Sequence, residues 1–181
     1  MIDIPKLKNR FKSRRVHYYP CIKKDFELNL KSLINEFSLD DKFDSLGYSK
    51  SSMLKGINMN SLIHENSKVE LKDPLTDLSK INNYDKYLEV IREYTMVDIF
   101  IVQASGITIG GEILFQDDIG NKISGSVFCA QKVIILVDIN NIYNDVDHFL
   151  DQRKGNVFSI IYGSMEGHKD RIHLIQIMEK I

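Results

Sequence analysis

The histidines of this chain do not fall at the spacing of a familiar metal site. His64 has no partner histidine four residues later, where the chain carries Lys68, so the paired histidines of zinc peptidases are absent. His168 and His173 stand five residues apart, but no third ligand follows at a recognisable spacing. We therefore predict no bound metal and no cofactor, and the sequence favours a binding protein over an enzyme.

The most suggestive carboxylate is Asp138, which directly follows five apolar residues, Val133 to Val137, and precedes Asn141. An apolar strand that ends in aspartate, with asparagine three positions later, resembles the first motif of NYN and PIN-like ribonucleases. The resemblance implies a Mg²⁺ or Mn²⁺ ion held by several carboxylates. The residues that could complete such a cluster are Asp98, Asp117, Asp118, Asp145 and Asp147.

A metal-dependent nuclease built around Asp138 is therefore one candidate function. The alternative is structural, because aspartate and asparagine often end a strand and begin a helix.

Charge divides the chain into two parts of opposite sign. Residues 1–24 carry about +7 and the remainder about −8, whereas the whole protein carries −1, which is typical of electrostatic recognition of a partner. Phe11, Tyr18 and Tyr19 lie among the basic residues, so this arm could bind nucleic acid by phosphate neutralisation and base stacking. The candidates are Lys8, Arg10, Lys12, Arg14 and Arg15. The alternative is a solvated tail, or an edge strand protected by its charges.

Acidic side chains gather in the second half of the chain and form a second candidate surface. They are Asp117, Asp118, Asp138, Asp145, Asp147 and Asp151. Such a face would attract a basic protein and speed its association, although it could also be an ordinary solvated helix face. Together with the lack of a catalytic set, it is typical of bacterial immunity proteins. Our leading prediction is therefore an immunity or antitoxin-type inhibitor whose partner is a cognate toxin, such as a nuclease.

Apolar periodicity places the elements that must position these residues. It predicts helices over 26–38, over 84–95 with Asn83 as the cap, and over 142–153. It predicts strands over 16–22, 97–103, 107–116, 123–128, 133–137 and 157–162, with a hairpin turn at 117–121. Pro20 restricts the first of these strands to a sheet edge, whereas the strand at 133–137 is apolar on both faces and is expected in the interior.

The remaining segments are less regular. Residues 39–82 are expected to form loops and short helical turns, and 170–181 fits a helix better than a strand. The predicted fold class is α+β, with N-terminal helices packed on a mostly antiparallel β-sheet in a single domain. Its parts are a basic arm or edge strand at 1–24 and a domain at 25–181, which is helical over 25–95 and β-rich over 96–162. No apolar run approaches the length of a membrane span and no secretory signal is present, so a cytoplasmic protein is expected.

Overall fold

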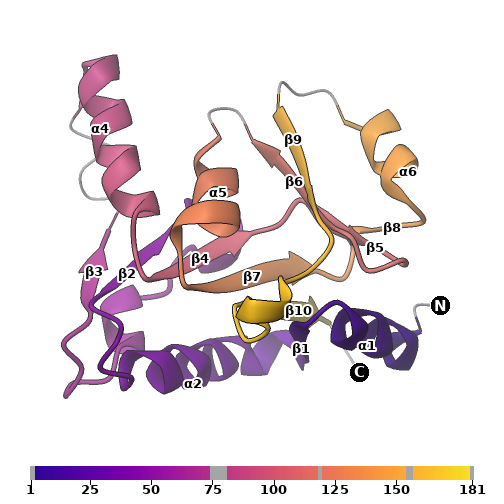
Figure 1. Cartoon of the computed structure of the whole chain (residues 1–181), viewed down its shortest axis with the longest axis horizontal. Coiled ribbons are helices and arrows are strands. Elements are labelled where there is room, and N and C mark those ends of the chain that lie inside the picture. The colour runs from indigo at the N-terminus through magenta and orange to yellow at the C-terminus, as the bar shows by residue number, and fades with distance from the viewer. Residues whose placement is uncertain (1–2, 74–80, 118–119, 154–156, 180–181) are drawn as a thin grey trace.

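The computed structural model describes residues 3–73, 81–117, 120–153 and 157–179, which form two β-sheets with helices around them (Figure 1). The larger sheet has six strands in the order β1-β10-β7-β4-β2-β3, and every neighbouring pair is parallel. Its strands are β1 (Val16–Ile22), β2 (Ser45–Tyr48), β3 (Glu70–Lys72), β4 (Ile99–Gln103), β7 (Lys132–Asp138) and β10 (Ile172–Met178).

The smaller sheet has four strands in the order β8-β5-β6-β9. Its strands are β5 (Gly106–Thr108), β6 (Ile113–Asp117), β8 (Ile142–Tyr143) and β9 (Val157–Ile161). The pairing of β6 with β5 and β9 is antiparallel, whereas β5 and β8 run parallel. This second sheet is built from the connections that lead from β4 to β7 and from β7 to β10.

Helices and short helical turns pack on both sheets and cover both faces of the larger one. They are α1 (Ile4–Ser13), α2 (Phe26–Ser38), α4 (Tyr84–Thr95), α5 (Asn121–Ser124) and α6 (Val146–Asp151), with the 3₁₀ turns η1 (Lys23–Asp25), η2 (Ser52–Leu54), η3 (Met59–Leu62) and η5 (Glu166–His168) and the π-helical turn η4 (Gly125–Cys129). Leu30 of α2 packs in one core cluster with Ile134, whereas Phe11 of α1 packs in the other with Val133. Figure 1 shows α2 below the sheet and α4 and α5 above it. None of the described helices is long and apolar enough to cross a membrane.

The predicted α+β fold on an antiparallel sheet is therefore wrong, and the architecture is α/β with a parallel sheet. The run at 133–137 already carried the signal, since strands buried on both faces are typical of parallel sheets. Residues 99–102 are likewise buried throughout. The prediction failed because the connection between β4 and β7 folds into strands and short helical turns instead of the single crossover helix that marks a parallel sheet.

Several segments differ from their predicted structure. Residues 4–13 of the predicted basic arm form α1, and the strand predicted over 107–116 is divided between β5 and β6. The helix predicted over 142–153 is limited to α6, because residues 142–143 form β8. Residues 39–82 contain the two short strands β2 and β3, and 123–128 is helical, spanning α5 and η4. Residues 170–181, expected as a helix, contain β10, every residue of which is buried. Other predictions are confirmed: α2 and α4 have the expected bounds, the Asn83 side chain accepts from Lys86 N, and β7 lies inside the sheet. β1 is an edge strand, as Pro20 requires.

Candidate functional site

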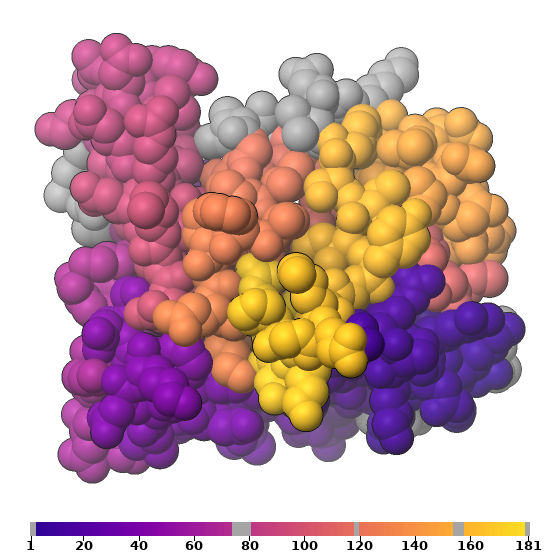
Figure 2. Space-filling view, in the orientation of Figure 1, coloured from indigo at the N-terminus to yellow at the C-terminus, as the bar shows by residue number. Residues whose placement is uncertain are grey.

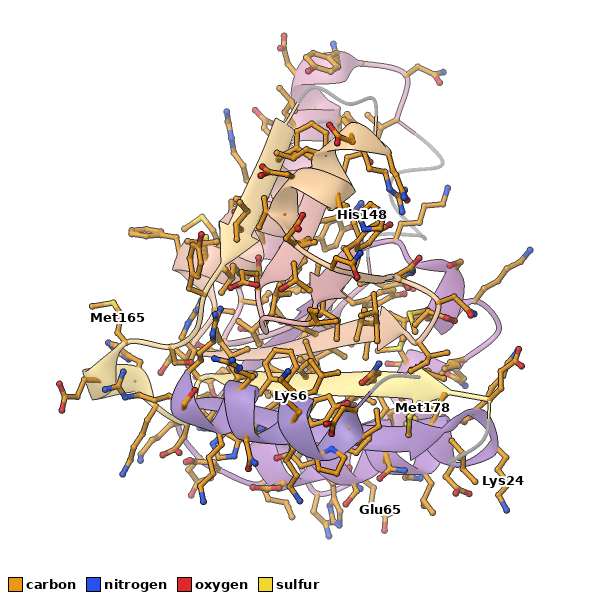
Figure 3. All side chains as sticks on the ribbon, turned by 90° about the vertical axis from the view of Figure 1, so that its right-hand side faces the viewer. Lys6, Lys24, Glu65, His148, Met165 and Met178 are labelled. Carbon is orange, nitrogen blue, oxygen red and sulfur yellow. The ribbon has the colours of Figure 1, made fainter. Side chains whose placement is uncertain are left out.

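The direction of winding reverses between β2 and β4. From β2 the chain continues outward to β3, then returns through α4 to β4 on the other side of β2, and proceeds away through β7 and β10. In open parallel sheets, ligands bind outside the carboxyl ends of the strands at such a switch point. Those ends lie on one side of the molecule, marked in Figure 3 by Lys24 after β1 and Met178 at the end of β10.

A cavity of about 460 Å³ lies at this switch point, within the usual range for small-molecule sites. Its wall is the end of β2 and the segment that follows it. The lining residues are Tyr48, Lys50, Ser51, Ser52, Leu54, Lys55, Gly56 and Ile57. We call this the switch-point cavity.

Hydrogen bonds tie the wall of the switch-point cavity to β4. The Ser51 hydroxyl accepts from Met53 N at 3.1 Å, which fixes the start of η2. The same hydroxyl donates to Gln103 Oε1 at 2.6 Å, and the Ser52 hydroxyl donates to that oxygen at 3.3 Å. Gln103 Nε2 has no hydrogen-bond partner among the described residues, and Gln103 lies behind the wall, since it is not itself a lining residue.

Two lysines make the cavity positive. Lys50 and Lys55 are both exposed, and neither forms an ion pair with any residue that the structure describes. Gly56 follows with φ +88, a left-handed conformation that favours glycine, and turns the chain beside them.

The floor of the cavity is apolar. Leu54 is buried and Ile57 packs against the core cluster beneath α2. The Tyr48 hydroxyl donates to Asp73 Oδ1 at 2.6 Å, and burial followed by this contact raises the pKa of Tyr48 well above its ordinary value. The phenol therefore stays neutral at physiological pH. Together these groups suit a small anion that also has an apolar part.

The lining of the switch-point cavity contains no histidine, cysteine, aspartate or glutamate. The ionisable and hydroxyl groups that line it are the ammonium groups of Lys50 and Lys55, the hydroxyls of Ser51 and Ser52 and the phenol of Tyr48. None of the described residues form a group of three or more metal-ligating side chains.

The acidic residues singled out from the sequence do not form one surface. Asp117 is 3 % exposed and accepts from Lys122 N at 2.7 Å, so it holds the start of α5. Asp138 accepts from Asn140 N at 2.8 Å within its own turn, as expected of a structural strand end. Asp145 caps α6 through His148 N, while Asp147 and Asp151 lie exposed on that helix; Asp118 lies outside the described residues.

The basic residues singled out from the sequence belong to α1 and the turn after it. Arg14 is half-buried and its Nη2 contacts Glu112 Oε1 at 2.6 Å, so it joins α1 to the smaller sheet. Lys8, Lys12 and Arg15 are exposed and line a groove beside β1, whereas Arg10 lines a separate surface of α1.

His173 serves the core and not a metal site. Its Nδ1 lies 3.2 Å from the Tyr19 hydroxyl and its Nε2 lies 3.0 Å from Asp170 O. A proton on Nε2 satisfies both contacts, with Tyr19 donating to Nδ1. Burial is the main cause that lowers the pKa of His173 to about 4, so the ring is neutral at physiological pH.

Sequence reasoning missed Lys50, Lys55 and Gln103. For Lys50 the signal was the polar run Ser49 to Ser52 directly after β2. It had meaning only once β2 was known to be a parallel strand, because polar residues in an irregular segment otherwise indicate a loop.

The fold resembles a known crystal structure. A DUF162 family protein from Deinococcus radiodurans superimposes with a TM-score of 0.58 at 13 % sequence identity, over 97 % of this chain and 96 % of that one. At this identity the likeness establishes the fold alone, and it agrees with the parallel sheet described above. A comparison with curated proteins finds no match.

A family model, the LUD domain, matches residues 4–159, which include α1, β1 and the whole switch-point cavity. This match overturns the functions predicted from the sequence. Two predictions are wrong: an immunity or antitoxin-type toxin inhibitor, and a nuclease built around Asp138. The family match also contradicts the third prediction, a nucleic-acid-binding module. The chain belongs to the LUD-domain family.

Proposed function

We propose that this chain is a ligand-binding domain of the lactate-utilisation type, which holds a small carboxylate such as lactate in the switch-point cavity. The observation that carries the proposal is a pair of lysines beside apolar side chains in the segment that follows β2. Lys50 and Lys55 form no ion pair with the described residues, and Leu54 and Ile57 line the same cavity. The family match supports the same ligand class.

The cavity matches the chemistry of a hydroxy or oxo acid. A carboxylate would gain charge-assisted contacts from the two ammonium groups that line the cavity. An adjacent oxygen of the ligand would accept from the amide of Gln103, whose carbonyl oxygen is held by Ser51 of the wall. The short alkyl part of the ligand would pack against Leu54 and Ile57. Because 460 Å³ exceeds the size of lactate, the proposed class is small carboxylates with lactate as its simplest member.

We place this binding in the cytoplasm. Cys21 and Cys129 are both free thiols, as proteins of a reducing compartment usually have.

Titration calorimetry with L-lactate, pyruvate and acetate tests the proposal. We expect one of the two three-carbon acids to bind with a measurable heat. Replacing either lysine, Lys50→Gln or Lys55→Gln, should weaken that binding by about tenfold, since a lost charge-assisted contact contributes on the order of 1.4 kcal/mol.

The matched control is Lys86→Gln, which removes an exposed lysine from α4 that does not line the cavity. The control should bind as the wild type does. No heat with any of the three acids, or an equal loss in the control, contradicts the proposal.

A further inference from the structure

A second concave surface runs along the outer edge of β1. This strand and β3 are the two opposite edges of the larger sheet. The surface is a groove of about 440 Å³ lined by Lys8, Lys12, Arg15, Val16, His17, Tyr18, Tyr19, Lys169 and Asp170. We call this the edge groove. Four of its residues, 16–19, are consecutive in β1, so the groove follows the strand.

The strand beneath the edge groove has an unpaired side. β1 pairs with β10 and has no second neighbour among the described strands. A proline fits into a strand where its missing N–H points away from the neighbour, so Pro20 indicates that its own backbone faces outward. Because orientation alternates along a strand, the backbone groups of Val16 and Tyr18 face outward too. The edge groove covers these two residues and ends before Pro20, where an added strand would lose a hydrogen bond.

The flanks of the edge groove are cationic. Lys8 and Lys12 stand one turn apart on α1, and Arg15 and Lys169 complete the set. None of the four forms an ion pair with a described residue. Figure 2 shows the two segments that supply them, α1 and the turn before β10, side by side on the surface. Among the residues that line the edge groove, the one carboxylate is Asp170, and its Oδ1 already contacts His17 Nε2 at 3.2 Å.

We propose that the edge groove docks an acidic, extended peptide segment of a partner protein, which adds to β1 as a further strand. Main-chain hydrogen bonds to Val16 and Tyr18 would supply the register, and alternate Asp or Glu side chains would meet the four cations. A second copy of this chain does not fit, because two cationic grooves would face each other.

An array of eight-residue peptides tests the proposal, with Asp or Glu at alternate positions and varied apolar residues between them. Peptides that bind are then measured in solution by fluorescence anisotropy with the full chain. We expect at least one to bind, and we expect its partner with Lys in place of each acid not to bind. In the complex, the amides of Val16 and Tyr18 should gain protection against hydrogen exchange.

A backbone-modified peptide separates strand addition from simple charge attraction. Methylating the amide nitrogens that would face β1 keeps every charge but removes the ladder, and should weaken binding at least tenfold. Methylating the alternate nitrogens should leave binding nearly unchanged.

Charge reversal on α1 supplies a matched pair of variants. Lys8→Glu with Lys12→Glu should weaken binding at least tenfold. Lys6→Glu with Arg10→Glu makes the same change in net charge on the same helix, but on a surface that does not line the edge groove, and should have little effect (Figure 3 labels Lys6).

Three results overturn the proposal: no acidic peptide in the array binds, N-methylation has no effect, or the two double variants lose binding equally. An oligonucleotide that binds as tightly as the best peptide and competes with it would also overturn it, and would mark a general polyanion surface. Because these residues lie outside the switch-point cavity, none of these results bears on carboxylate binding there.

Discussion

At the scale of single residues, the two ends of β4 carry polar side chains with opposite roles. Asp98, at the amino end, accepts from Asp44 N, from both Ser45 N and Oγ, and from Gln131 Nε2, at 2.9 to 3.1 Å. Burial alone would raise the pKa of Asp98, but these hydrogen bonds outweigh it and hold the pKa below its ordinary value. Gln103, at the carboxyl end, uses only its carbonyl oxygen within the described residues. The first residue is structural, whereas the second has amide donors that no described residue uses.

His173 gives a prediction about pH. Its pKa is about 4 in the folded protein, against 6.5 for an ordinary histidine, and the groups that face it are His17, Tyr19, Lys132 and Asp170. Between these two values the unfolded chain binds a proton that the folded chain does not, so stability falls as the pH falls from 6.5 towards 4. A fully developed difference of this size corresponds to about 3 kcal/mol.

His173→Gln keeps a donor and an acceptor but does not titrate. Urea unfolding at about pH 7 and about pH 4.5 should therefore show a smaller acid-induced loss of unfolding free energy in this variant, by about 2 kcal/mol. His168→Gln, on the exposed turn η5, is the control and should keep the wild-type loss. An unchanged loss in the His173 variant would show that another group causes the acid sensitivity.

At the scale of elements, the sequence could predict α2, α4 and β7 because local signals agree there. α4 has a cap at Asn83 and one apolar face, and β7 is an unbroken apolar run. β10 was missed because His173 and Gln176 interrupt its apolar pattern. Both are buried at 4 % and 0 % exposure and are held by tyrosines from β1, Tyr19 and Tyr18. Buried polar residues in a strand cannot be recognised from the sequence until the neighbouring strand that supplies their partners is known.

The packing of α4 on β2 depends on a glycine. A Cβ atom at Gly47 would lie 2.4 Å from Tyr94 O and 3.1 Å from Val97 Cγ2, so the helix would have to move. Gly47→Ala should lower the unfolding free energy by about 2 kcal/mol, as overpacking in a close contact typically does. Urea unfolding measures this.

Gly167→Ala is the control for that variant, because a Cβ atom at Gly167 would meet nothing within 4 Å and the φ of this residue is not positive. We expect it to unfold like the wild type. If both glycine variants behave alike, the close approach of α4 to β2 is not a feature of the folded protein.

At the scale of the whole molecule, the family match ends at residue 159, but the sheet does not. β10 lies between β1 and β7 and pairs with both over most of its length. Removing it would detach β1 and expose the interior strand β7. The segment beyond the matched range is therefore required by the fold.

Truncation tests this requirement. A chain that ends at Asp170 should lose its cooperative unfolding transition. β10 contributes buried residues to both core clusters, and the free energy lost with them is larger than the free energy of unfolding of a typical domain. A chain that ends at Met178 keeps β10 and should unfold like the full protein. Circular dichroism during urea unfolding distinguishes the two, and a cooperative transition in the shorter chain would contradict the role given to β10.

The candidate site also belongs to this scale. It forms where β2 and β4 meet, and its wall is held by a hydrogen bond between Ser51 and Gln103. These two residues are 52 positions apart in the sequence, so no local pattern brings them together. The sequence showed the polar run, but only the order of the strands shows that it lies at a switch point. Asp138 became a candidate catalytic residue for a related reason, since it ends a strand that the sequence alone does show.

The central claim is that small carboxylates bind in the switch-point cavity, and mapping amide chemical shifts during a titration with lactate or pyruvate tests it most directly. We predict that the largest shifts fall on residues 50–57, which line the cavity, and on Gln103, which is hydrogen-bonded to Ser51 of its wall from a separate part of the chain. Shifts that cluster elsewhere, for example along β1, or no saturable shifts at all, would contradict the account.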